Sequence, residues 1–76
     1  MKSNIVYQYF KKESKQETVY IQYDSIQLKG ARLSLIKDEL VHEEVEFTGS
    51  AIEDLKADGF IEANALEYHL VLKGLA

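Results

Sequence analysis

The chain has 76 residues, with 13 carboxylate side chains against 9 Lys or Arg, so its formal net charge is −4, and it contains neither cysteine nor proline. This length limits it to one small domain, residues 1–76. The lack of cysteine excludes a disulfide scaffold, a cysteine-ligated zinc and a cysteine nucleophile. Apolar residues make up 46% of the chain, which argues against disorder.

The first third of the chain predicts a β-hairpin. Residues 4–11 and 18–28 are rich in β-branched and aromatic types, and the polar residues 12–17 between them suit a loop. Because side chains alternate along a strand, we expect one face of the second strand to carry Val19, Ile21 and Tyr23, and the other Tyr20, Gln22 and Asp24. Whether residues 24–30 are strand or helix is left open by the pattern.

Two helices are expected after Gly30. Leu33, Ile36 and Leu40 recur at the i, i+3, i+7 spacing of an amphipathic helix over residues 31–43. A second helix is expected over residues 50–58. It begins with Ser50-Ala51-Ile52-Glu53, which fits a capping box, and ends at Gly59, which can supply a left-handed stop with Phe60 closing a Schellman motif.

The C-terminal part predicts a second hairpin. Residues 60–62 form its first strand and residues 63–65 its turn, and Tyr68, Leu70 and Leu72 alternate with other residues along a second strand over 66–72. The expected fold class is therefore α+β, with an N-terminal β-hairpin, two helices and a C-terminal wing-like β-hairpin.

Residues 50–75 resemble the last helix and wing of the winged-helix superfamily. Two segments carry the resemblance, Leu55-Lys56-Ala57-Asp58-Gly59-Phe60-Ile61 and Tyr68-His69-Leu70-Val71-Leu72-Lys73-Gly74. It implies an incomplete winged-helix-like fold, since two helices are expected where that family has three. In members that bind DNA, the helix before the wing enters the major groove. Here that helix carries Glu53, Asp54 and Asp58, which the phosphates of DNA would repel, so no DNA contact is carried over to it.

Charge is divided unevenly along the chain. Residues 1–37 hold seven cations and three anions, a sum of +4, whereas residues 38–76 hold two cations and ten anions, a sum of −8. The favoured interpretation is a non-enzymatic interaction module, an accessory or regulatory protein whose acidic part attracts a basic protein partner or the basic hairpin of a second copy. Both faces of the 4–11 strand are partly apolar, which also favours a partner or a homodimer. The candidate interaction surface comprises Tyr7, Tyr9, Lys11, Lys12, Tyr20, Tyr23, Glu43, Glu44, Asp54 and Asp58.

The alternative is a nucleic-acid-binding regulator that uses the Lys- and Tyr-rich first hairpin, in which tyrosines stack bases and lysines hold phosphates. An enzyme is not expected, because no nucleophile motif or phosphate-binding glycine loop is present. Asp38, His42 and Glu46 could ligate a metal if they shared a helical face, but a solvated face is the simpler interpretation. No cofactor, metal or small-molecule substrate is therefore inferred. No apolar run is long enough to span a membrane, and a cytoplasmic location is expected.

Overall fold

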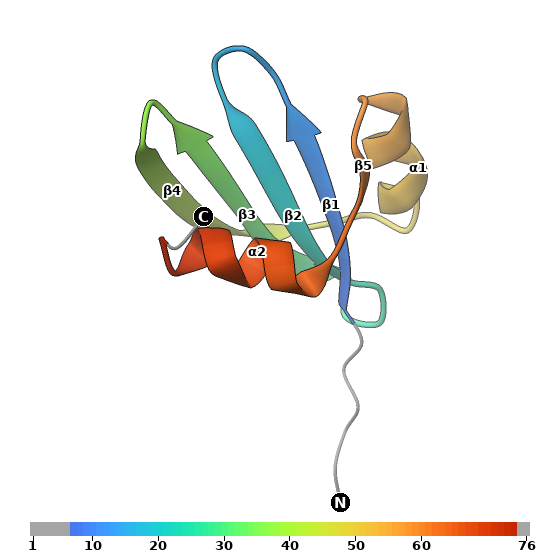
Figure 1. The fold of residues 1–76 in the computed structure, drawn as a ribbon. Coiled ribbons are helices and arrows are strands. Elements are labelled where there is room, and N and C mark those ends of the chain that lie inside the picture. The colour runs from blue at the N-terminus through green and yellow to red at the C-terminus, as the bar shows by residue number, and fades with distance from the viewer. Residues whose placement is uncertain (1–6, 75–76) are drawn as a thin grey trace, which may run out of the picture.

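A computed structural model describes residues 7–74. It contains one antiparallel sheet of five strands in the order β4-β3-β2-β1-β5, together with two short helices (Figure 1). The elements in chain order are β1 (Tyr7–Glu13), β2 (Thr18–Asp24), β3 (Lys29–Ile36), β4 (Glu39–Glu46), α1 (Ala51–Ala57), β5 (Ile61–Ala63) and α2 (Ala65–Leu72). The expected fold of two hairpins and two helices, winged-helix-like, is therefore wrong.

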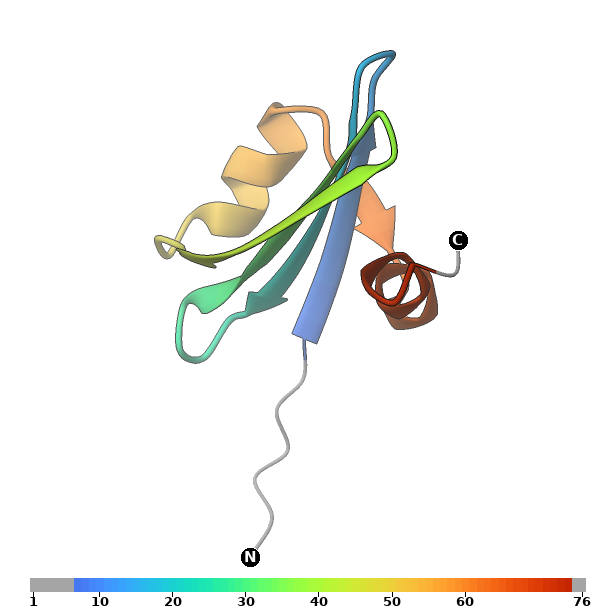
Figure 2. The same cartoon turned by 90° about the vertical axis from the view of Figure 1, so that its left-hand side faces the viewer.

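The two helices lie on opposite faces of the sheet (Figure 2). On the α1 face, Ala51 packs with one row of strand side chains, namely Phe10, Val19, Ile21 and Tyr23. On the α2 face, Tyr68 and Val71 pack with Tyr20, Leu33 and Tyr9. The predicted alternation along β2 is confirmed, and it explains how one strand can supply side chains to two separate cores.

The expected first hairpin is present as β1 and β2. Tyr7 pairs with Asp24 and Glu13 with Thr18, so the strands align over their whole described length. Positions 4–6 of the predicted strand lie outside the described residues. Residues 25–28 form a turn, in which Asp24 Oδ1 accepts hydrogen bonds from the backbone N–H groups of Ile26 and Gln27 over 2.9 and 3.3 Å. Of residues 24–30, whose conformation the sequence pattern leaves open, residues 25–28 are thus a turn, Asp24 ends β2, and residues 29–30 begin β3.

The predicted helix over 31–43 is wrong, because this segment forms most of a second hairpin, β3 and β4. Ala31, Leu33 and Leu35 also alternate with period two, and that strand pattern prevails over the helical one in the sheet. The turn lies at Lys37 and Asp38, whose φ angles are 48° and 69°. Two successive positive φ angles define a type I′ turn, which usually carries Asn and Gly. Because Lys37 and Asp38 stand in place of these residues, the sequence does not indicate the turn.

The predicted helix over 50–58 is confirmed as α1, although its N-terminal cap differs from the prediction. The Ser50 side chain makes no capping hydrogen bond, and its hydroxyl donates to Asp54 Oδ2 over 3.2 Å instead. The C-terminus follows the prediction. Gly59 has a φ of 99°, and the backbone N–H of Phe60 donates to the carbonyl of Leu55 over 2.9 Å. This is the Schellman closure.

The predicted strand over 66–72 is wrong, because residues 65–72 form α2. Asn64 caps this helix, since its side-chain Oδ1 accepts a hydrogen bond of 2.7 Å from the backbone N–H of Glu67. Asn followed three residues later by Glu is a helix-start signal. This signal lies at Asn64, whereas the predicted strand rests on the alternating apolar residues that follow it. The helix that Asn64 caps covers one face of β1 and β2.

Candidate interaction surface

Glu67 on α2 joins the helix to two strands. The Lys11 Nζ donates to Glu67 Oε2 over 2.8 Å, and the Tyr20 hydroxyl donates to the same oxygen over 2.9 Å. The hydrogen bond from Lys11, followed by that from Tyr20, lowers the pKa of Glu67 below its ordinary 4.5. The same bond raises the pKa of Lys11. Burial, followed by the bond to Glu67, raises the pKa of Tyr20 to about 12. We call these three residues the Glu67 cluster.

Lys12 also forms an ion pair with a carboxylate. It points to the α1 face, where its Nζ lies 3.6 Å from Asp58 Oδ1 and 5.9 Å from the centre of the Phe60 ring. A third ion pair joins Arg32 Nη1 and Glu43 Oε1 over 3.9 Å. Each pair connects a cation from the basic first half of the sequence with an anion from the acidic second half. Over β1 and its neighbours, the charges that are separate in sequence are therefore interleaved in space.

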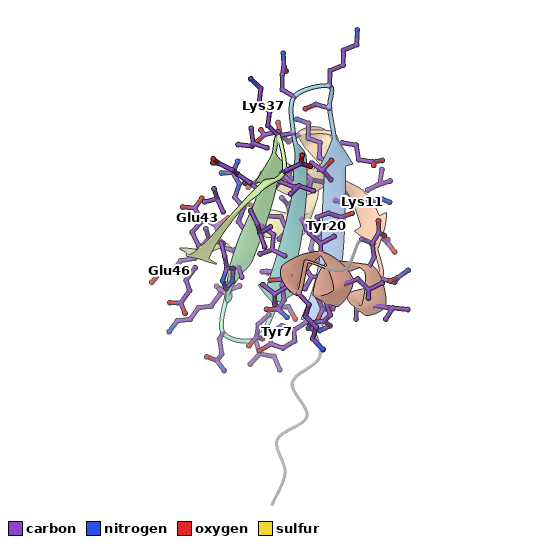
Figure 3. All side chains as sticks on the ribbon, turned by 60° about the vertical axis from the view of Figure 1, so that its left-hand side comes forward. Tyr7, Lys11, Tyr20, Lys37, Glu43 and Glu46 are labelled. Atoms are coloured by element: carbon purple, nitrogen blue, oxygen red, sulfur yellow. The ribbon has the colours of Figure 1, made fainter. Side chains whose placement is uncertain are left out.

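The four tyrosines of the candidate surface differ in accessibility. Tyr20 and Tyr23 are 6% and 3% exposed, so neither ring offers a face to a ligand. Tyr9 is half-buried, and its ring centre lies 5.1 Å from that of Tyr68. Tyr7 is 38% exposed, at the end of the sheet where β1 begins (Figure 3). Of these four rings, only that of Tyr7 is broadly available for contact.

The four acidic residues of the candidate surface do not form one patch. Asp54 and Asp58 belong to α1 and the turn after it, whereas Glu43 and Glu44 lie on β4. Within β4, the register places Glu43 opposite Arg32 and Glu44 opposite Ala31, so their side chains point to opposite faces of the sheet. Glu43 and Glu44 therefore share a strand but not a face of the sheet.

β4 is the outermost strand on its side of the sheet, and every residue except Val45 is exposed. It carries four glutamates, Glu39, Glu43, Glu44 and Glu46. Glu43 and Glu46 project from this margin, on the far side of the sheet from Lys11 (Figure 3). Among residues 7–74, one ion pair reaches these glutamates, that between Arg32 and Glu43. This edge therefore has a local excess of negative charge.

The turn at Lys37 and Asp38 determines which β4 backbone groups are free. In a hairpin closed by two residues, the flanking pair, Ile36 and Glu39, is hydrogen-bonded, and bonded pairs recur at every second position. The 2.8 Å hydrogen bond from the Phe47 N–H to the Leu28 carbonyl fits this alternation, because Leu28 and Phe47 are eight positions from Ile36 and Glu39 along their strands. The backbone N–H and C=O groups that point away from β3 are therefore those of Leu40, His42, Glu44 and Glu46.

A hollow of about 580 Å³ lies beside β4 on the α2 face of the sheet. It occupies the end of the sheet where β1 begins and β4 ends, beyond the area that α2 covers. Four strands line it, and the lining residues on which its chemistry depends are Tyr7, Asp24, Lys29, Ala31, Glu44 and Glu46. We call it the Asp24 hollow. Sequence reasoning missed it, because its residues come together only through the register of β1 to β4.

The structure gives the metal interpretation no support. Asp38 lies in the turn before β4, so it does not share a helical face with His42 and Glu46. Within the part of the chain that the structure describes, no group of three or more His, Asp or Glu side chains is placed to hold a metal ion. In the same residues, no helix combines the length and the apolar character needed to cross a membrane.

No family model, curated protein or solved structure matches the chain. The resemblance of residues 50–75 to the winged-helix superfamily therefore stays a prediction.

Proposed function

We propose that this chain is a small non-enzymatic interaction module, and that its β4 edge binds an extended basic segment of a partner protein. The observation that carries the proposal is the open edge of β4, an exposed strand of eight residues with four glutamates. The location of the complex is proposed to be the cytoplasm.

The backbone of β4 supplies the binding energy in this proposal. An outer strand presents unpaired N–H and C=O groups that can pair with an incoming strand. In β4 these groups belong to alternate residues from Leu40 to Glu46, enough for a short ladder. Leu40 and Val41 are 38% and 46% exposed, so an incoming strand would also cover apolar surface.

The charge of β4 selects the partner. A cationic segment places Lys or Arg beside the glutamates, and opposite charges on neighbouring strands stabilise pairing. A second copy of this chain, paired through its own β4, would instead bring two sets of four glutamates together. Like charges directly opposite one another are destabilising, so the edge favours a basic partner over self-association.

The nucleic-acid alternative receives less support from the geometry. It required free lysines beside exposed tyrosine rings on the first hairpin. Lys11 and Lys12 each lie against a carboxylate, and Tyr20 is buried. This arrangement favours a protein partner over a nucleic acid.

Fluorescence anisotropy with two labelled peptides tests the proposal. In one peptide Lys alternates with Val, and in the other Glu alternates with Val. The Lys peptide should bind and the Glu peptide should not. Binding should weaken as salt rises, because the screening length falls from about 10 Å at 0.1 M to about 3 Å at 1 M.

A matched pair of variants separates strand pairing from charge attraction alone. His42→Pro removes an N–H that points to the open edge, and the β3–β4 ladder does not use this group. His42→Val keeps the N–H. We expect His42→Pro to abolish binding and His42→Val to preserve it. A Lys peptide methylated on alternate backbone nitrogens makes the same test without changing the protein. Equal binding by both variants and by the methylated peptide would reject the β4 edge as the site.

A further inference from the structure

The Asp24 hollow contains a carboxylate that is unusually well buried for a surface site. Asp24 is only 5% exposed. Its Oδ1 accepts the two turn N–H groups of Ile26 and Gln27. Among residues 7–74, no hydrogen bond reaches its Oδ2, although the residue lines the hollow. One carboxylate oxygen is therefore held in place by the turn, and the other is left for a ligand.

The surroundings of Asp24 favour a cationic ligand. Glu44 and Glu46 also line the hollow, and Lys29 is the one Lys or Arg among the lining residues, so carboxylates outnumber it three to one. No ion pair within 4.0 Å joins Lys29 to these carboxylates in the described part of the chain. A positive group that enters the hollow would be attracted by the three carboxylates and repelled by Lys29, which the register places between Asp24 and Glu46, so the attraction prevails by number.

The shape of the hollow favours a flat cation. Its lining includes Gly30 and Ala31 of β3. Because these residues have little or no side chain, they leave space above the sheet at this point. The exposed ring of Tyr7 lies on the β1 side. A guanidinium group is planar, stacks on aromatic rings and presents paired N–H donors that match a carboxylate, whereas an ammonium group does not.

We propose that the Asp24 hollow binds the guanidinium group of an arginine from the partner protein. This inference rests on the proposed function, because it names a side chain that the basic partner must carry. The hollow begins at Glu44 and Glu46, on the strand to which the partner is proposed to pair.

The spacing of strands restricts where this arginine lies in the partner. A strand added to β4 is three strand spacings, about 14 Å, from β2, where Asp24 lies. An arginine side chain within the added strand is too short to cross that distance. The arginine must therefore follow or precede the paired segment, where the partner chain leaves β4 beside Glu46 and passes over the hollow.

The direct test is a titration followed by two-dimensional NMR of backbone amides, with N-acetyl-arginine methylamide as the probe. We expect saturable shifts at the amides of Asp24, Gly30 and Ala31. The matched citrulline compound has the same shape without the charge and should cause none. The lysine compound should bind more weakly than the arginine compound.

Asp24→Asn is the decisive variant, because it keeps the Oδ1 acceptor of the turn while it removes the negative charge. We expect it to weaken arginine binding about tenfold, as loss of a charge-assisted hydrogen bond does. Asp54→Asn on α1 removes an equal charge outside the hollow and should change nothing. Tyr7→Leu provides a second variant that leaves Asp24 and its turn unchanged, and it should also weaken binding.

The outcomes separate this inference from the proposed function. If the arginine compound causes no saturable shifts at these amides, or if both Asp24→Asn and Tyr7→Leu bind like the parent, the inference is overturned. The β4 proposal would survive if His42→Pro still abolished peptide binding. Conversely, arginine binding that is sensitive to Asp24→Asn supports the hollow even if no peptide pairs with β4.

Discussion

Lys11 and Glu67 are 56 positions apart in the chain, and 2.8 Å separates the Lys11 Nζ from the Glu67 Oε2. This contact joins the first strand to the last helix. The hydroxyl of Tyr20 reaches the same carboxylate oxygen. The ion pair between Lys11 and Glu67 thus stabilises the fold, and it also explains why Lys11 is not available to bind a phosphate.

Removal of the Tyr20 hydroxyl should destabilise the protein. In Tyr20→Phe the buried ring remains, but Glu67 loses a hydrogen-bond donor, so we expect a loss of about 1 kcal/mol in the free energy of unfolding. Urea denaturation measures this loss. Tyr7→Phe is the matched control, because its ring is exposed at the end of the sheet, and it should change stability little. Equal stability of Tyr20→Phe and the parent would contradict the prediction.

The Glu67 cluster should make stability depend on acid pH. The pKa of Glu67 is lowered by folding, so its contribution is present above the ordinary value of 4.5 and is lost as pH falls through the lower folded value. The difference in urea midpoint between the parent and Glu67→Gln should therefore shrink between about pH 6 and pH 3. Glu62→Gln, an exposed change on β5, should leave the midpoint near that of the parent. A constant difference for Glu67→Gln across this range would refute the assignment.

Tyr20 should ionise at a higher pH than an ordinary tyrosine. Burial and the bond to Glu67 raise its pKa from 10.0 to about 12, and burial also raises the pKa of Tyr68. Folding favours the neutral phenol of Tyr20, so its contribution to stability is complete below about pH 10 and is lost as pH rises through about 12. Ultraviolet absorbance of tyrosinate follows this step. Tyr20→Phe should remove the absorbance change near pH 12, and the same change in this variant and in the parent would contradict the assignment to Tyr20.

Gly30 should not tolerate a side chain. An added Cβ would lie 1.7 Å from the Gln22 carbonyl oxygen and 3.1 Å from the Phe47 ring, so the backbones of β2 and β3 would have to separate. We expect Gly30→Ala to cost about 3 kcal/mol, the upper end of the usual cost of overpacking. Gly49→Ala is the matched control, because no heavy atom beyond Gly49 and its two chain neighbours lies within 4 Å of the added Cβ. Thermal denaturation compares the two, and similar losses would show that steric contact is not the cause.

The β3–β4 turn can be improved. In the described part of the chain, positive φ angles at non-glycine residues are confined to Leu28, Lys37 and Asp38. Lys37→Asn with Asp38→Gly supplies the residues that a type I′ turn prefers, and should stabilise the protein by about 1 kcal/mol. The same two residues placed at Ser25 and Ile26, where φ is negative, should give no gain. A loss of stability at 37–38 would contradict the assigned turn type.

Sequence patterns predicted the parts of the fold that depend on local chemistry. The alternation of Val19, Ile21 and Tyr23 identified β2 and its two faces, and Gly59 identified the end of α1. These signals are contained in a few neighbouring residues. They do not depend on which other strand or helix packs against them.

The errors have equally specific causes. Residues 31–43 satisfy both a helical and a strand period, and the true turn lies at Lys37 and Asp38, which lack the usual turn residues. In α2 the alternation of Tyr68, Leu70 and Leu72 is typical of a strand, whereas the capping signal at Asn64 indicates a helix. The Asp24 hollow could not be predicted, because it depends on the register of β3 and β4 beside β2, and residues 31–43 were predicted as a helix.

The two margins of the sheet are unequal, and this inequality limits the assemblies that the protein can build. β5 is a strand of three residues, whereas β4 has eight. A strand added at β4 finds no equally long edge at the opposite margin on which a further molecule could continue the pattern. Repeated edge-to-edge addition of copies is therefore disfavoured, and a complex formed through the proposed β4 site is expected to hold one partner per chain.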